Sequence, residues 1–171
     1  MITTISVWID KVNVAMGKTV AYFTVIMAVV MFLIVVLRYG FNLGSIALQE
    51  SITYMHAAVF LLGSAYTFQQ NGHVRVDVFY RRFSKKTRCI VDLLGSLLLM
   101  LPIAIYLSIV CHHYVFESWS ILEGSREPGG LPFVYVLKSF LLIFAYSLIL
   151  QAFSEAIKNM KNIFLLQREI Q

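Results

Sequence analysis

The sequence predicts an all-α integral membrane protein: a four-helix bundle with two amphipathic helices at the membrane surface, one N-terminal and one mid-chain. Of its 171 residues, 59% are hydrophobic and 13% are charged, whereas soluble domains have about half apolar and about a quarter charged residues. A helix of about 20 residues crosses a hydrocarbon core about 30 Å thick. Four apolar runs are long enough, at about 19–37, 46–68, 90–110 and 131–153, and we expect them to form one domain over residues 1–171.

The residues before the first run predict a short amphipathic helix lying in the membrane interface. Ile5, Trp8, Ile9 and Val12 recur at helical spacing, whereas Lys11 lies elsewhere on the wheel. We expect Trp8 at headgroup depth and Lys11 near lipid phosphates. A frayed tail is the alternative, because a helix this short is marginal by itself.

A basic segment separates the second and third runs. As a helix, residues 73–88 would place Val76, Phe79 and Phe83 on one face, with Asp77 four residues before Arg81 in a favourable pair. Residues 73–78 also alternate like a strand, but an unpaired strand at a bilayer surface leaves its backbone without partners. We therefore expect a helix flat on the membrane, whose basic residues contact lipid: Arg75, Arg81, Arg82, Lys85 and Lys86.

The distribution of positive charge predicts the orientation. Lys and Arg are frequent before the first run, between the second and third, and after the fourth, while the other two connections hold only Arg38 and Arg126. Since positive charge near span ends is retained in the cytoplasm, both termini should be cytoplasmic. The net charge of +5 is explained by this topology and does not indicate nucleic-acid binding.

Four ionisable residues in or beside the runs are candidates for a structural role or a partner interface. Asp92 lies four residues after Arg88 and can pair with it. Glu50 and Lys138 enter their runs from the same side at comparable depth, so we expect them to pair with each other or with a partner protein. A transported-ion or proton site is the sharper alternative. His56 lies about 120° around the helix from Glu50, so the two do not converge on one ligand.

Metal and haem sites have weak support in the sequence. His112, His113 and Glu117 lack the spacing of three or four converging zinc ligands, so we expect no metal site. Ligation of haem by His56 opposite His112 or His113 is conceivable and would make the chain an electron-transfer subunit. Phosphate-binding glycine loops, nucleophile elbows and HExxH pairs do not occur, so we expect no catalytic residues and no cofactor.

Several short motifs resemble the small membrane subunit of tripartite ATP-independent periplasmic (TRAP) transporters. The similarity covers about residues 20 to 155 and is most specific in Gly72–Arg82 and in the turn Pro128–Pro132. The other matching stretches are residues 49–57, 60–67, 92–95, 118–119, 123–125 and 137–138.

The resemblance implies an accessory subunit without enzymatic activity in a bacterial inner membrane. In that family the small subunit pairs with a large multi-span permease, a periplasmic binding protein delivers the substrate, and a sodium gradient drives uptake. The expected role is therefore to anchor and stabilise the large subunit of an importer of organic acids. Contact with the binding protein would be transient and on the outer face.

Two other classes remain open at this level: a haem-bearing electron-transfer subunit and a small exporter that works as a dimer. The absence of a cluster of polar groups or broken helices within the runs disfavours transport by this chain alone.

Overall fold

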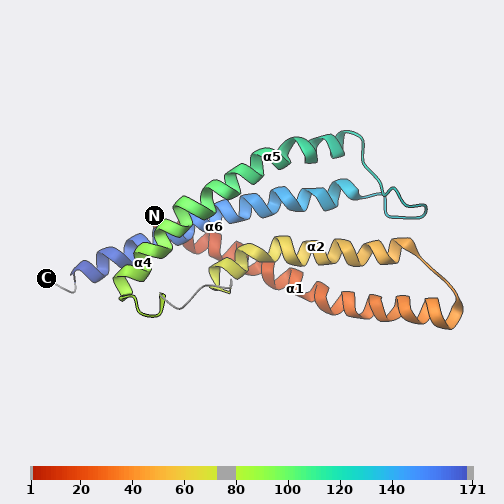
Figure 1. Ribbon diagram of the computed structural model, residues 1–171, viewed down its shortest axis with the longest axis horizontal. Coiled ribbons are helices and arrows are strands. Elements are labelled where there is room, and N and C mark those ends of the chain that lie inside the picture. Colours follow the sequence, from red (N-terminus) through yellow and green to blue (C-terminus); the bar gives the residue numbers. More distant parts are fainter. Residues whose placement is uncertain (1, 73–79, 169–171) are drawn as a thin grey trace.

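Helices form all the regular structure of residues 2–72 and 80–168, which the computed structural model describes. The helices are α1 (Ile2–Phe41), α2 (Ile46–Gln69), α4 (Lys85–Leu94), η1 (Gly95–Met100), α5 (Leu101–Ser120) and α6 (Val134–Arg168). Figure 1 shows them side by side in the order α1, α2, α6, α5, with both termini at one end and the loops 42–45 and 121–133 at the other. The prediction of an all-helical chain is confirmed.

Three helical stretches of the described chain are long and apolar enough to cross a membrane: 4–41, 85–120 and 134–168. They contain the first and third predicted runs and all of the fourth from residue 134 on; residues 131–133, with which that run was predicted to begin, belong to the preceding loop. The second run forms α2, which has 24 residues and would measure about 36 Å at 1.5 Å per residue. Gln49, Glu50 and His56 lower its hydropathy, so a fourth span remains a prediction.

The N-terminal segment is not a separate helix, contrary to our expectation. It continues into the first predicted span as the 40-residue α1. Its buried positions are Ser6, Ile9 and Asn13, whereas Trp8 is 65% exposed. Hydrogen-bond partners on α6 account for the burial of Ser6 and Asn13, and Ile9 is the one described residue of the predicted apolar face that is buried with them.

Gly17 sets how closely α1 approaches α2. A Cβ atom at Gly17 would lie 2.6 Å from Cγ of Tyr66, so only glycine fits against that ring. Close approach through small residues is typical of helix pairs in membranes. The glycine therefore acts in packing and does not interrupt α1.

The third helix contains a wide turn that the sequence analysis missed. α4, η1 and α5 follow one another without a gap, and η1 is a π-helical turn in which the N–H of Leu101 bonds to the carbonyl of Ser96. Pro102 follows directly. Its ring cannot donate a hydrogen bond and clashes with the carbonyl four residues earlier, which explains the local change of register.

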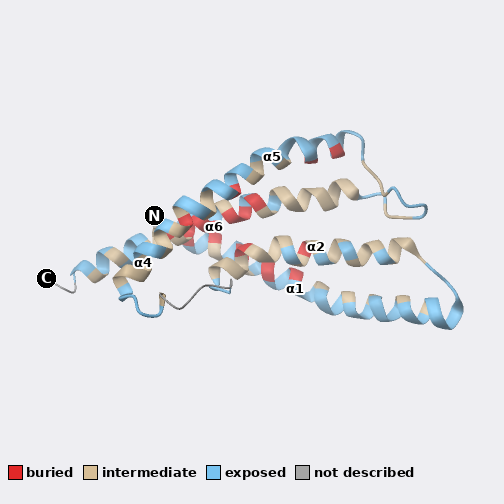
Figure 2. Cartoon of the chain, in the orientation of Figure 1, coloured by how far each residue is buried: buried red, intermediate tan, exposed pale blue. Residues whose placement is uncertain are grey.

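The core lies where the helices meet on α6 (Figure 2), and small residues dominate it. Ala65 of α2, Ala104 of α5 and Leu148 of α6 form its centre. Further along α6, Ala145, Ala152 and Ala156 are also buried. Such positions let helix backbones approach closely in a bilayer, where lipid tails compete equally for apolar side chains.

Part of the predicted mid-chain amphipathic helix, residues 73–79 with Arg75 and Asp77, lies outside the described residues. The rest is not the single helix expected, because the chain turns at residues 81–84 and residues 85–88 begin α4. The described structure resumes at Tyr80, and Ser84 caps α4 by accepting a hydrogen bond from the N–H of Thr87 at 3.2 Å. Arg81, Arg82 and Lys85 are exposed, and Lys86 is half-buried. Lipid contact by these residues stays a prediction.

Candidate functional site

The loop 121–133 is fastened to α2 by one carboxylate. Glu50 lies near the start of α2 and accepts hydrogen bonds from the hydroxyl of Ser125 and from the N–H of Leu131, the latter at 2.6 Å. A Cβ atom added at Gly130 would lie 2.8 Å from Oε1 of Glu50. The glycine therefore lets the loop backbone rest directly against the carboxylate.

A second carboxylate fastens the same loop to α6. Glu123 forms an ion pair with Lys138, whose side chain is 14% exposed. The Lys138 ammonium also lies 3.9 Å from the centroid of the Tyr114 ring of α5, a cation–π contact. The hydrogen bond from Lys138 holds the pKa of Glu123 below its ordinary value. Together, these contacts join α5, α6 and the loop at one end of the bundle.

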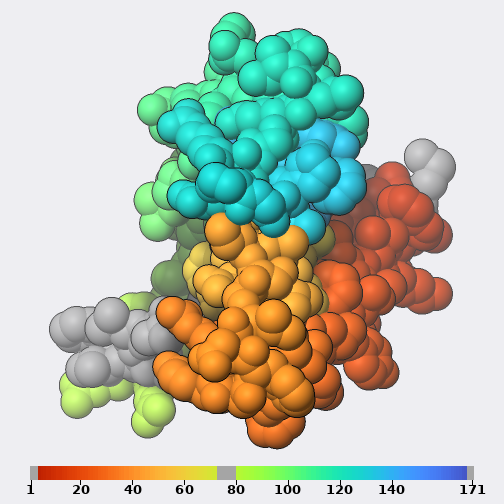
Figure 3. All heavy atoms as spheres, turned by 90° about the vertical axis from the view of Figure 1, so that its right-hand side faces the viewer, coloured from red at the N-terminus to blue at the C-terminus, as the bar shows by residue number. Residues whose placement is uncertain are grey.

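Aromatic contacts complete this end of the molecule. The indole N–H of Trp119 donates to the hydroxyl of Ser139 at 2.8 Å, and the Trp119 ring meets Tyr135 edge to face at 4.6 Å. Figure 3 views the bundle from this end and shows the loop and α5 beside the start of α2. We call residues 121–133, with the side chains that hold them, the loop clamp.

Glu50 and Lys138 each contact the loop clamp, whereas we expected them to pair with each other or with a partner protein. The two residues do lie at the same end of the bundle, as their depth in the sequence predicted, because both contact the loop 121–133. In the described structure, however, each bonds to the loop that lies between them, Glu50 to Ser125 and Lys138 to Glu123. These contacts were not predictable from the sequence, because residues 128–132 indicate only a turn.

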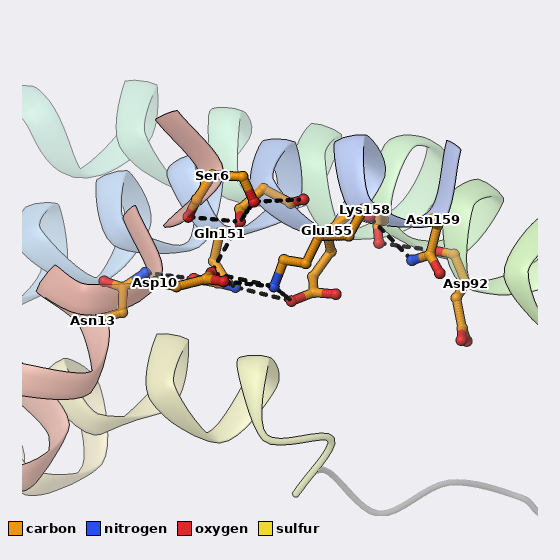
Figure 4. A network of polar contacts seen from close by, with 10 residues as sticks. Ser6, Asp10, Asn13, Asp92, Gln151, Glu155, Lys158 and Asn159 are labelled. Atoms are coloured by element: carbon orange, nitrogen blue, oxygen red, sulfur yellow. Dashed lines mark hydrogen bonds and ion pairs between the residues drawn. The ribbon is translucent and has the colours of Figure 1, made fainter. Parts of the chain in front are cut away.

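A buried polar network joins α1 to α6 near the opposite end (Figure 4). The side-chain oxygen of Gln151 accepts from Asn13 at 2.7 Å, and its nitrogen donates to Asp10 at 3.1 Å and to Glu155 at 3.0 Å. Lys158 pairs with Asp10 at 2.9 Å and with Glu155 at 2.6 Å. Gln151 is fully buried.

Two serines extend this network. Ser6 and Ser154 hydroxyls lie 2.7 Å apart, and Ser154 also donates to Asp10 at 2.9 Å. We call the whole set the α1–α6 network: Ser6, Asp10, Asn13, Gln151, Ser154, Glu155 and Lys158. The sequence analysis did not single out these contacts. The available signal was the spacing of three or four residues between polar side chains on each helix, which places each set on one face.

The remaining candidates are dispersed. Asp92 accepts a hydrogen bond from the Tyr80 hydroxyl at 2.7 Å, and Arg88 lies 5.4 Å from the Tyr80 ring centroid. His56 is exposed on α2 and stacks on Phe60. A groove of about 630 Å³ separates the end of α2 from η1 and α6, with Asp92, Glu155 and Lys158 among its lining residues.

The histidines considered for haem do not face one another. His112 stacks on Phe116, and His113 lies 3.6 Å from Glu117, both on α5. α6 lies between α5 and the helix that carries His56 (Figure 1). Within the described residues, no three histidine, cysteine or acidic side chains come together as a metal site. The polar groups are thus arranged for packing and for holding a loop.

Comparison with known proteins agrees with this arrangement. Residues 4–162 match the family described as tripartite ATP-independent periplasmic transporters, DctQ component. A Haemophilus influenzae protein described as a TRAP transporter small permease is 29% identical over 94 residues, which cover 55% of this chain and 53% of that protein. The aligned part thus spans about half the length of this relative. No solved structure matches. Together with the three apolar helices, the family match shows that this membrane protein belongs to the DctQ family of TRAP transporter components.

Proposed function

We propose that the chain is the accessory scaffold subunit of a sodium-coupled, binding-protein-dependent importer of organic acids, and that it anchors and stabilises the large permease subunit. One observation carries the scaffold role: the charged side chains in the first turns of α2 and α6, Glu50 and Lys138, are used to hold this chain's own loop. A residue that fixes a loop in this way is not available to bind a transported solute. Sodium coupling and the substrate class follow from the family resemblance.

The proposed topology has four spans in the bacterial inner membrane, with both termini cytoplasmic. α2 packs along α1 and α6, and about 36 Å of helix exceeds a hydrocarbon core of about 30 Å. The two termini and α4 lie at the same end of the bundle (Figure 1), and the exposed basic residues Arg82 and Lys85 lie just before and at the start of α4. Positive charge at that end supports a cytoplasmic location.

The loop clamp would then face the periplasm, where the binding protein approaches. Its tip exposes Arg126, Glu127 and Pro128, while Glu50 and Lys138 hold the loop at both sides. A surface fixed in advance loses little conformational entropy when a partner binds. Transient docking of the periplasmic binding protein on this tip is therefore part of the proposal.

Co-purification tests the scaffold role. A tagged copy of this chain, expressed with its genomic neighbours and extracted in mild detergent, should retain a large multi-span permease. Deleting the chain should abolish sodium-dependent uptake of the substrate, and the isolated chain in liposomes should not transport it. Recovery of the chain free of any membrane partner, or uptake that persists without it, would contradict the proposal.

A further inference from the structure

One stripe of α2 is open to the surroundings of the chain. The exposed residues of this helix are Gln49, Thr53, His56 and Phe60, and its other residues are half-buried or buried. Their spacing of i, i+4, i+7 and i+11 places all four on one face of the helix. At 1.5 Å per residue the stripe is about 16 Å long, and His56 lies about 15 Å from the start of α2. In the proposed four-span topology this places His56 near the middle of the bilayer core.

The polarity of this stripe is the reverse of that of the other exposed stripes. Three of its four residues carry hydrogen-bonding side chains. In the third helix, the exposed residues at the same spacing are Leu99, Ile103, Tyr106 and Val110. In α6, the exposed residues on one face are Ile143, Tyr146, Leu150 and Phe153. Of these three stripes, only the α2 stripe is mainly polar and therefore poorly suited to contact with lipid tails.

Lipid cannot satisfy the hydrogen-bonding groups of the α2 stripe. Histidine within a membrane span almost always faces protein or a water-filled cavity, because hydrocarbon offers it no partner. The imidazole of His56 is exposed and stacks on Phe60, with ring centroids 6.5 Å apart. A neighbouring protein helix can supply the missing donors and acceptors.

We infer that the α2 stripe is the surface on which a transmembrane helix of the large permease subunit packs. That helix should carry small residues with hydroxyl or amide side chains, since a neutral stripe containing an amide, a hydroxyl and an imidazole pairs best with other uncharged polar groups. The inference rests on the proposed scaffold function and adds the face through which it acts.

Site-specific photo-crosslinking in the assembled membrane complex tests the location. A benzophenone amino acid replaces Phe60, which is 72% exposed, and as a matched control replaces Tyr106, which is 65% exposed in the apolar stripe of α5. Position 60 should form an adduct with the mass of this chain plus the large subunit, several-fold more abundant than that from position 106. An adduct of two copies of this chain, equal yields at both positions, or no protein adduct at position 60 would overturn the inference. Co-purification without crosslinking from position 60 would refute only this face and leave the scaffold role intact.

Substitution of His56 tests the hydrogen bond itself. His56→Leu should lower the amount of large subunit retained by this chain about three- to thirty-fold, as expected for one polar contact between helices in a membrane. His56→Gln should restore most of it, and Phe60→Leu should change it little. Because His56 is exposed, the melting temperature of the isolated chain should not fall in His56→Leu. Equal retention by the His56→Leu and wild-type chains would overturn the inference, as would a loss that glutamine does not restore.

Discussion

Replacing Gln151 by leucine should loosen the contact between the first and the last helix. The fully buried Gln151 amide bonds to Asn13, Asp10 and Glu155. Each such bond contributes about 0.6–1 kcal/mol in a membrane or protein interior, so the loss should be about 2–3 kcal/mol. For a chain of this size, that corresponds to a fall in melting temperature of about 4–12 °C.

The assay is unfolding of the purified chain in detergent micelles, followed by circular dichroism. Gln167→Leu is the matched control, because Gln167 is exposed on the same helix and the chemical change is identical. A double-mutant cycle with Asn13→Leu should give a coupling energy of about 0.5–1.5 kcal/mol between the two amides. If Gln151→Leu costs no more than Gln167→Leu, the α1–α6 network does not stabilise the fold.

Gly17→Leu should destabilise the chain by about 1–3 kcal/mol through overpacking against the tyrosine ring of α2. Gly40→Leu should not, because no atom lies within 4 Å of the added Cβ. Thermal unfolding of both variants checks this prediction, and equal stability of the two would contradict the packing role of Gly17. The hydrogen bond from Lys138 lowers the pKa of Glu123, so the clamp's contribution to stability should be present at neutral pH and lost in acid, as the pH falls through that lowered pKa. A Lys138→Met chain should lose that part of the pH dependence, and identical profiles of melting temperature against pH in the two chains would refute the assignment. Replacing Arg82 and its basic neighbours by glutamate should reduce the fraction of molecules with a cytoplasmic C-terminus, measured with a C-terminal reporter fusion; an unchanged orientation would show that these charges do not set the topology.

The helices were predictable from the sequence because apolar length alone identifies them. Each of the four predicted runs corresponds to a helix, although residues 131–133 of the fourth lie in the loop, and α1, α6 and the third helix extend well beyond the runs. Hydropathy marks only the part of a helix that suits hydrocarbon. It gives no sign that residues such as Lys85 and Lys158 continue the same helix past the membrane.

The contacts were much less predictable than the helices. Periodicity placed Trp8, Ile9 and Val12 on the apolar face of the N-terminal segment, but of these only Ile9 is buried, together with Ser6 and Asn13. Their burial depends on partners about 140 positions later, which no local pattern contains. Likewise, the common depth of Glu50 and Lys138 was evident, but the path of the loop between them was not.

The α1–α6 network also has a consequence for the order of events during synthesis. Asn13 and Gln151 are separated by 138 positions, which a ribosome making about 5–20 residues per second covers in roughly 7–28 s. During this interval Asp10 and Asn13 lack their hydrogen-bond and ion-pair partners on α6. They precede the apolar run 19–37, where interfacial water can serve as their temporary partner. The first helix is thus made early in synthesis, but its contacts with α6 form last.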